Sequence, residues 1–302
     1  MLEKHGKPDV RSIQDPKSKM KLGIVTDSTC DLPASLIEEG GIEVAPCILV
    51  LDGREYVDGQ GQARDDFYRR LPGLRRAPTT AAPSSEEFAG RYDRLLAAGC
   101  GHVLSIHAAG TLTSLLANAR QAAGRFAGRV SVIDSGSLSV GLGFQVLAAA
   151  EAAADEGAQA LEAARAAVRS TQQRLRVFAA LDSLEYLRRS GRAPAVMAAL
   201  GSLLRVKPLI ELSNGEVKLV ATLRTTAQAN ARMLGLMRQG GSLERLAVLH
   251  TGAEGRARRF LQDVMMEMNR SMPRGILLVN VTTMIGAHLG PNGLGFASVR
   301  GR

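Results

Sequence analysis

The sequence predicts an α/β protein with two domains, the first built on a largely parallel sheet and the second on a mixed sheet with an antiparallel hairpin. The chain has 302 residues, of which 45% are hydrophobic, and this is enough to form two cores. Short apolar runs alternate with helix-like segments in the first half, a pattern typical of parallel sheets. Asn214 and Gly215 form a strong hairpin signal in the second half.

Three strand candidates in the first half are each followed by a small polar junction and then by a helix. The strands are KLGIVT at 21–26, VLSIH at 103–107 and VSVID at 130–134. Parallel neighbours end at the same edge of a sheet, so we expect the three junctions to converge there. The helices expected after them begin near residue 33, span 113–126 and span 143–156.

Residues 51–85 interrupt this alternation and contain a Pro-rich stretch, LPGLRRAPTTAAPSS. Pro and Gly at this density favour turns and loops over regular elements. We therefore expect an excursion, with a small hairpin or an extended loop, that covers the sheet edge and packs on the second domain.

The pattern changes after about Arg176, so we place the first domain at 21–176 and the second at 177–302. A helix is expected over 181–190 and ends at Gly191. The elements expected after it are hairpin strands at 207–212 and 216–224, a helix over 227–238, a strand over 246–250, a helix over 255–269, a strand over 275–283 and a Gly-rich loop over 285–297.

Residues 1–20 differ in composition from the rest, because they hold four of the seven lysines. We expect a polar leader outside the folded domains, either disordered or not native. It lacks the apolar stretch of a secretory signal, and no run of about 18 uncharged apolar residues occurs in the chain, so a cytoplasmic protein is expected. Cys30, Cys47 and Cys100 lack disulfide or metal-pair spacing and are expected to be reduced.

Charge and composition argue against nucleic acid as a partner. The net charge is +9, but the arginines are scattered along Ala-rich stretches and form no basic run. Only 4% of the residues are aromatic and none is Trp, so base stacking is disfavoured. The five histidines lack ligand spacing and there is no GxxxxGK[ST] motif, so we expect neither a metal nor a nucleotide cofactor.

The small polar junctions place unpaired N–H groups at helix starts, where an anion is favoured. Ordinary capping explains any one junction, and three together leave capping and an anion site as equal alternatives. His288 lies in the Gly-rich loop, where the backbone can approach a ligand closely, so we favour a functional role for it. Arg192 follows Gly191 and is either an anion partner or a partner of the helix dipole.

Seven ordered blocks resemble the DegV family of fatty-acid-binding proteins, which serve as carrier subunits of bacterial fatty acid kinases. The blocks are IVTDSTCDLP, PTTAAPS, AAGTLTSLLANA, VIDSGSLSVGLG, LDSLEYLRRSGR, LGSLLRVKPLIEL with NGEV, and IGAHLGPNGLG. The similarity covers 21–297. It implies a two-domain α/β fold whose ligand lies at the domain interface, with the lipid tail buried and the carboxyl group held at the sheet edge.

The resemblance also implies roles for single residues. Thr80 of PTTAAPS matches a threonine that binds the carboxylate, and His288 matches a histidine of the Gly-rich loop. Arg192 matches an arginine near the head group. Arg224 of ATLRT matches an arginine linked to phosphoryl transfer by the partner kinase.

Four further residues complete the expected ligand-binding set, namely Ser28, Ala109, Gly110 and Thr111. The family usually has Ser-Gly-Thr where this chain has Ala109-Gly110-Thr111, so a hydroxyl expected on the carboxylate is absent. TAAPS likewise replaces the common TSQPS.

From this resemblance we expect a cytoplasmic carrier without catalysis of its own. Its expected partners are a long-chain fatty acid, a fatty acid kinase subunit that makes acyl phosphate for phospholipid synthesis, and transiently a membrane surface. One alternative is a hydrolase or transferase that acts on an acylated or phosphorylated small molecule with Ser28 or Thr111 and His288. A second alternative is a DNA-binding regulator, which would need a basic stripe.

Overall fold

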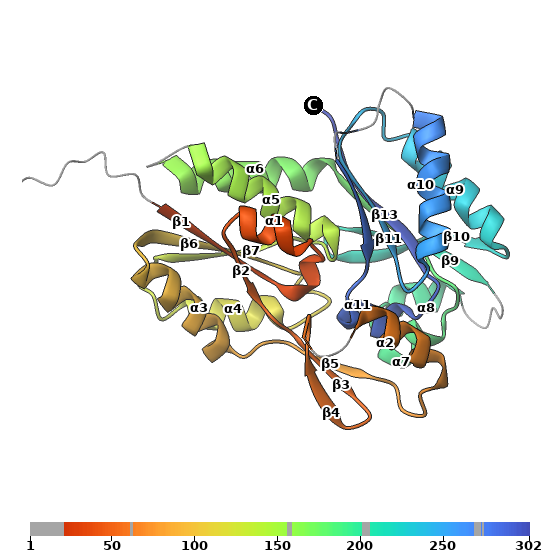
Figure 1. The fold of residues 1–302 in the computed structure, drawn as a ribbon, viewed down its shortest axis with the longest axis horizontal. Coiled ribbons are helices and arrows are strands. Elements are labelled where there is room, and N and C mark those ends of the chain that lie inside the picture. The colour runs from red at the N-terminus through yellow and green to blue at the C-terminus, as the bar shows by residue number, and fades with distance from the viewer. Residues whose placement is uncertain (1–20, 61–62, 156–158, 201–205, 269–272, 274) are drawn as a thin grey trace, which may run out of the picture.

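The computed structural model describes residues 21–60, 63–155, 159–200, 206–268, 273 and 275–302. The leader expected at 1–20 therefore lies outside the described residues. A parallel sheet and a mixed sheet lie side by side (Figure 1), which confirms the predicted fold class.

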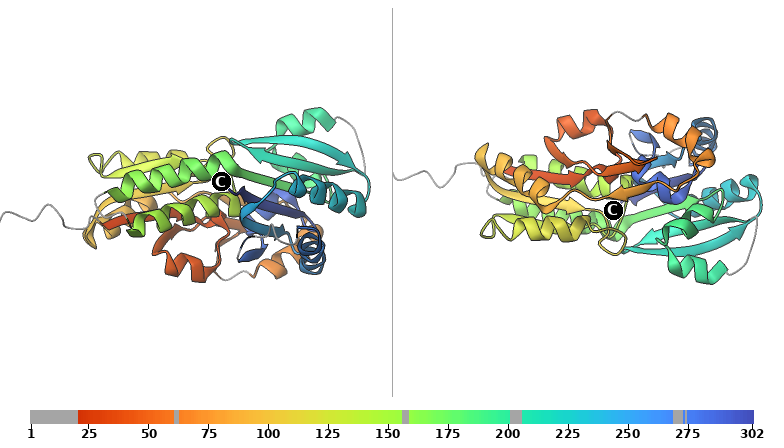
Figure 2. Two further views of the ribbon diagram at one scale, coloured as in Figure 1. Left: turned by 90° about the horizontal axis from the view of Figure 1, so that it is seen from above. Right: turned by 90° about the horizontal axis from the view of Figure 1, so that it is seen from below.

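The first sheet has four strands in the order β2-β1-β6-β7, and all neighbours are parallel. Helices cover both of its faces, with α3 and α4 on one side and α5 and α6 on the other (Figures 1 and 2). A strand covered on both faces is apolar along its length, which explains the run KLGIVT. The elements of this half are β1 (Lys21–Asp27), a 3-10 turn (Ser28–Cys30), α1 (Ala34–Glu39), β2 (Ile42–Ala45), α3 (Ser85–Ala97), β6 (Cys100–His107), α4 (Leu115–Ala123), β7 (Val130–Asp134), α5 (Val140–Asp155) and α6 (Ala160–Arg174).

Between β2 and α3 the chain forms a small antiparallel sheet in the order β4-β3-β5. Figure 1 shows this sheet below the first sheet. Tyr68 of this segment donates from its hydroxyl to the Val281 carbonyl at 2.7 Å. The segment thus contacts the chain that follows the second sheet's strand β12. Its elements are β3 (Ile48–Leu51), β4 (Arg54–Val57), α2 (Arg64–Arg70), a 3-10 turn (Leu71–Gly73) and β5 (Thr79–Ala81), and β12 is Ile276–Asn280.

The second sheet has six strands in the order β10-β9-β8-β13-β11-β12. Only β11 and β12 are parallel neighbours, and the predicted hairpin joins β9 to β10 through Asn214 and Gly215, both at positive φ. Helices α9 and α10 pack on one face. The remaining elements are β8 (Leu175–Ala180), α7 (Glu185–Ser190), α8 (Pro194–Leu200), β9 (Lys207–Ser213), β10 (Glu216–Leu223), α9 (Thr226–Arg238), β11 (Leu243–His250), α10 (Glu254–Met268), α11 (Thr283–Leu289) and β13 (Leu294–Arg300).

Three predicted elements of the second half were wrong in extent, and one of them, the strand expected over 246–250, already begins at Leu243. The helix expected over 181–190 begins only at Glu185, because the Leu181 N–H still donates to the Pro208 carbonyl across the sheet. The strand expected over 275–283 ends at Asn280, because the side chain of Thr282 caps a helix. The domain boundary at 176 and 177 stays a prediction, and β8 spans it.

The predicted Gly-rich loop over 285–297 was also wrong. The chain there continues helix α11 to Leu289, turns, and enters strand β13 at Leu294. Gly290 ends the helix at φ +81, where a Cβ would collide with the Tyr186 ring. The glycines therefore serve a helix end and a close approach, and they do not form a long loop.

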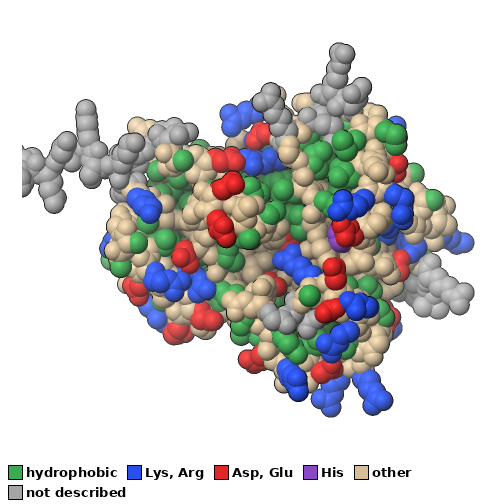
Figure 3. Space-filling model, in the orientation of Figure 1, with side chains coloured by type: hydrophobic (Ala, Val, Ile, Leu, Met, Phe, Trp, Pro, Cys, Tyr) green, Lys and Arg blue, Asp and Glu red, His purple; other side chains and the backbone are tan. Residues whose placement is uncertain are grey.

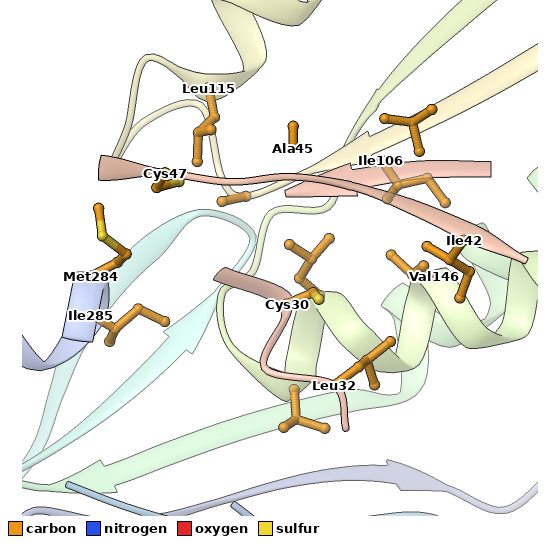
Figure 4. Packing of buried hydrophobic residues seen from close by; sticks show 14 of the residues in the cluster. Cys30, Leu32, Ile42, Ala45, Cys47, Ile106, Leu115, Val146, Met284 and Ile285 are labelled. Atoms are coloured by element: carbon orange, nitrogen blue, oxygen red, sulfur yellow. The ribbon is translucent and has the colours of Figure 1, made fainter. Parts of the chain in front are cut away.

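One hydrophobic cluster crosses from the first sheet to α11. Figure 4 shows Met284 and Ile285 of α11 beside Cys47 and Leu115, which come from the first half of the chain. The helices within the described residues include none that is both long and apolar enough to cross a membrane.

Candidate functional site

Thr80 and His288 form a polar pair between the small sheet and α11. The Thr80 Oγ1 lies 3.2 Å from His288 Nε2. Thr80 sits on β5, where it pairs in register with Leu49, and α11 is started by the Thr282 side chain, which accepts from the Met284 N–H. The resemblance placed both residues at a head group, and the fold brings them together.

His288 has a second ring nitrogen to offer. Its Nδ1 is buried and has no hydrogen-bond partner among the described residues. Burial, and then the nearby positive charge of Arg192, lower the pKa of His288 to about 4. The imidazole is neutral at pH 7, so one nitrogen donates and the other accepts. A buried polar atom without a partner favours a ligand that supplies one.

An apolar cavity of about 130 Å³ adjoins this pair, and we call it the inner cavity. Apolar side chains from both halves of the chain form most of its wall. Its lining residues are Thr29, Cys47, Thr80, Ala81, Ala82, Leu112, Thr113, Ser114, Leu115, Leu138, Leu187, Arg192, Ala193, Ile210, Val217, Met284, Ile285, His288 and Leu289.

A second cavity of about 100 Å³, which we call the deep cavity, is almost wholly apolar and shares five lining residues with the inner cavity. The two cavities therefore adjoin, and together they lead from the polar pair toward the second sheet. The shared residues are Leu138, Ile210, Val217, Ile285 and Leu289. Such a space, polar at one end and apolar along the rest, fits an amphipathic molecule with an aliphatic tail.

Arg192 lies at the inner cavity, directly after Gly191, which ends α7 at φ +65 as predicted. Its Nη1 donates to the Leu112 carbonyl at 3.2 Å. A guanidinium has five N–H donors, so this bond leaves others for a ligand. The side chain thus lies at the same cavity as His288.

The three strand-end junctions converge at one sheet edge, but their polar groups bind other parts of the protein. The Ser28 Oγ accepts from the Cys47 N–H at 3.1 Å. The Gly110 N–H donates to an Asp134 oxygen at 3.3 Å, and the Thr111 hydroxyl donates to the Gly215 carbonyl. Within the described residues, Ser28 and positions 109–111 are not among those that line the two cavities.

Asp27 and His107 form the buried centre of this edge. His107 Nδ1 lies 3.0 Å from Asp27 Oδ2, and its Nε2 lies 2.6 Å from Ser105 Oγ. The contacts from Asp27 through His107 to Ser105 resemble those of a catalytic triad, but all three residues are fully buried. The Ser105 hydroxyl is also 2.9 Å from the Tyr92 hydroxyl. A nucleophile without access to substrate is inert, so we assign His107 a structural role.

Arg224 lies outside the candidate site. It is exposed at the end of β10, and its backbone N–H donates to the Gln228 Oε1 at 3.0 Å. It is not among the described residues that line the inner and deep cavities. The structure therefore does not bring Arg224 to the cavity.

Several cavity residues were not anticipated from the sequence. Ile210 and Val217 belong to the predicted hairpin, but strand alternation alone does not tell which of its faces is covered. Thr29 and Cys47 stand at the carboxyl end of β1 and just after β2, the edge where a ligand was expected. No group of three or more metal-ligating side chains occurs in the part of the chain that the structure describes.

Comparison with known proteins gives a consistent match. A family model described as uncharacterised proteins of the DegV family matches residues 21–300. The chain is 35% identical to a DegV domain-containing protein of Streptomyces coelicolor over 279 residues, 91% of this chain and 96% of that protein. It is 33% identical to one of Mycobacterium tuberculosis over 283 residues, with the same coverage of 91% and 96%.

Solved structures match over nearly the whole chain. A DegV family protein from Thermus thermophilus, described by its fatty acid binding, has a TM-score of 0.85 and 31% identity, and the match covers 93% of this chain and 100% of that one. DegV from Bacillus subtilis, described as a fatty acid binding protein, has a TM-score of 0.82 and 26% identity with the same coverage.

Proposed function

Because this chain belongs to the DegV family, we propose that it is a carrier that holds a long-chain fatty acid. The carboxylate is bound by Thr80 and His288 with Arg192 beside them, and the tail occupies the inner and deep cavities. The observation that carries the proposal is the buried, unpartnered Nδ1 of His288 at one end of an apolar cavity. The description of the Thermus thermophilus and Bacillus subtilis proteins as fatty acid binding supports it.

The chemistry of the two cavity ends supports an aliphatic acid. Burial of each methylene is worth about 0.8 kcal/mol, so a tail of about fifteen methylenes contributes roughly 12 kcal/mol before the costs of immobilisation. A carboxylate desolvated beside that tail must be hydrogen-bonded. Thr80, His288 and Arg192 offer a hydroxyl, a ring nitrogen and a guanidinium for this.

In this proposal the residues at the strand edge hold the backbone that forms the cavity wall. Ser28 holds the backbone of Cys47, which lines the inner cavity, and Thr111 holds Gly215 in the hairpin turn two residues before Val217. Ala109 is fully buried, and its N–H donates to the Ser137 carbonyl at 2.9 Å. With Gly110, these residues shape the cavity wall around the ligand.

In the cytoplasm the carrier presents the carboxylate of its bound fatty acid to a separate kinase, and this kinase forms acyl phosphate for phospholipid synthesis. Arg224 is exposed and outside the cavity, and both features suit a contact with the kinase. A guanidinium can dock an acidic surface or stabilise charge on the transferring phosphoryl group. The carrier needs no cofactor for this, and it meets membrane surfaces transiently to exchange its lipid.

The alternative enzyme requires Ser28 or Thr111 beside His288. In the described residues, Ser28 contacts the Cys47 backbone and Thr111 contacts the Gly215 carbonyl, while the side-chain contact of His288 is with Thr80. None of these contacts pairs Ser28 or Thr111 with a base, so no observation favours the alternative.

Native mass spectrometry of freshly purified protein tests the proposal. We expect a mass increment of about one fatty acid per chain, released into organic solvent, because a tail buried in apolar surroundings dissociates slowly. A protein that carries no lipid and also fails to bind added palmitate would contradict the proposal. Turnover of an acyl ester without a partner would favour the alternative enzyme.

A further inference from the structure

Hydroxyl-bearing side chains line the inner cavity at four positions, namely Thr29, Thr80, Thr113 and Ser114. A hydroxyl has one proton to donate and two lone pairs that accept. A carboxylate has no proton to give, so a hydroxyl binds it only by donating. The residues whose hydroxyl proton is free are therefore the ones that can bind the head group of a fatty acid.

Two of the four hydroxyls are engaged with other side chains. The Thr29 hydroxyl donates to Oδ1 of the fully buried Asp27, so toward a ligand it can only accept. The Thr80 hydroxyl is paired with His288. Ser114 is exposed, and its side chain does not cap α4, so among the described residues its hydroxyl has no partner that holds it toward the cavity.

Thr113 combines a fixed oxygen with a free proton. Its Oγ1 accepts from the Leu115 N–H at 3.1 Å, at the start of α4. Its hydroxyl proton has no acceptor within the part of the chain that the structure describes, and the side chain is half-buried. A side chain that is already held in place loses little freedom when it binds a ligand. The Thr113 hydroxyl is therefore a preorganised donor in the cavity wall.

Contacts on both sides of the turn that carries Thr113 place it near the other head-group residues. Arg192 donates to the carbonyl of the residue directly before Thr113. From α4, the Asn118 side chain donates to the Pro83 carbonyl at 2.8 Å, three residues after Thr80. The turn thus lies between Arg192 and the chain that follows Thr80.

Positive charge on this side of the molecule favours an anionic head group. Figure 3 shows Lys and Arg side chains gathered at the lower right, over α2, which belongs to the same segment of the chain as Thr80. Arg192 lines the inner cavity itself, and the described lining residues include no Asp or Glu. A concave site lined by one sign of charge concentrates the opposite ion. The group that meets the Thr113 proton is therefore expected to be an anion.

We propose that Thr113 donates its hydroxyl proton to the carboxylate of the bound fatty acid, and that it thereby selects the acid over neutral lipids with the same tail. This inference rests on the proposed function. The two oxygens of a carboxylate offer about four lone-pair positions, so the site has room for a donor besides Thr80, His288 and Arg192. Hydrogen bonds to an ionised acceptor are roughly twice as strong as those to a neutral one. Loss of the Thr113 hydroxyl should therefore weaken binding of an acid more than binding of the corresponding alcohol.

The experiment compares laurate with dodecanol, which have equally long chains and differ in the head group. Each ligand competes against a fluorescent fatty acid on the delipidated full chain. Thr113→Val removes the hydroxyl and keeps the shape of the side chain, and Thr113→Ser keeps the hydroxyl. Ser114→Ala is the matched control, because Ser114 lines the same cavity but is exposed. Thr113→Ala repeats the test if the valine variant does not fold.

We expect Thr113→Val to bind laurate about tenfold or more weakly, and dodecanol less than about threefold more weakly, than the wild type. Thr113→Ser and Ser114→Ala should bind laurate within about threefold of the wild type.

An equal loss for both ligands in Thr113→Val would show that Thr113 only supports the start of α4, and it would overturn the proposal. Unchanged laurate affinity in Thr113→Val, or an equal loss of laurate affinity in Thr113→Ser, would overturn it as well. A wild type that binds neither palmitate nor laurate would instead overturn the proposed function, so the two failures are distinguishable.

Discussion

The side chains of Thr80 and His288 meet at 3.2 Å although 208 positions separate them in the sequence. One comes from a three-residue strand beside the first sheet and the other from a helix that follows the second sheet. A ligand held by both therefore depends on elements from the two halves of the chain.

Replacing His288 tests the head-group site directly. Loss of a hydrogen bond to a charged acceptor costs about 1.5 to 3 kcal/mol, so His288→Ala should weaken palmitate binding about tenfold or more. Isothermal titration on delipidated protein measures this. His102→Ala is the matched control, because His102 contacts Ser131 away from the cavity. Affinity unchanged within about twofold would remove His288 from the site.

The pH dependence of binding should follow the same imidazole. Its pKa is about 4 in the protein without ligand, and a bound carboxylate raises that pKa by adding a negative charge nearby. Between the two pKa values the complex binds more protons than the free protein, so palmitate affinity should rise as the pH falls through the raised pKa toward 4. His288→Asn should flatten this rise. An identical pH profile in the variant would disprove that the His288 imidazole causes the pH dependence.

Ile210 lies where the inner and deep cavities adjoin. A larger side chain there should shorten the tail that fits, and loss of three buried methylenes alone costs about 2.4 kcal/mol, roughly fiftyfold in affinity. We expect Ile210→Trp to bind decanoate nearly as the wild type does and palmitate far more weakly. Ile210→Val is the control, and Val217→Phe provides a second obstruction if the tryptophan variant misfolds. Equal palmitate affinity in both bulky variants would place the tail elsewhere.

Substitution of Arg224 should distinguish binding of the lipid from its phosphorylation by the kinase. Since it is exposed and lies beyond the cavity, Arg224→Ala should leave palmitate affinity near that of the wild type. Acyl phosphate formation by the kinase of the same source should fall by about tenfold or more, because a guanidinium that orients or stabilises the transferring group is gone. The exposed Arg232→Ala on α9 is the control. Equal phosphorylation of variant and wild type would refute the role of Arg224.

Asp31 should make stability depend on pH. It is buried, its Oδ1 is 3.0 Å from Arg64 Nη1, and it also accepts from the Ser139 hydroxyl at 2.6 Å and the Thr282 N–H at 2.8 Å. Burial raises its pKa to about 6, against the opposing effects of Arg64 and the donors.

The folded state then binds more protons than the unfolded state between about pH 4 and pH 6. The contribution of Asp31 to stability is therefore largest below that range and is lost as the pH rises through 6. Relative to Asp31→Asn, the wild type should gain up to roughly 3 kcal/mol as the pH falls from 7 to 4, measured by urea unfolding. The exposed Asp66→Asn serves as control, and a pH-independent difference for Asp31→Asn would contradict the assignment.

Local signals in the sequence predicted the parallel sheet and the β9-β10 hairpin. Asn214 and Gly215 specify their turn by backbone preference alone, so no distant residue is needed. The helix around His288 was missed for the opposite reason. Gly286 weakens the helical signal of TMIGAHL, and it is required because a Cβ there would collide with Tyr68, a residue 218 positions earlier.

Part of the candidate site was also predicted from the sequence. Thr80, His288 and Arg192 were identified by resemblance, and the structure places all three at the inner cavity. Arg76 and Arg189, which line a neighbouring cavity with Arg192, were not identified, because they are surface residues in ordinary charged segments of the sequence.

The hydrophobic cluster that joins the first sheet to α11 also affects how this protein unfolds. Val177, Ala297 and Val299 of the second sheet pack in the same cluster as Val25 and Leu104 of the first. A chain cut between the sheets would leave each piece with an uncovered apolar surface. We therefore expect the two halves to unfold together, with a bound acyl chain acting as a removable part of their common interior.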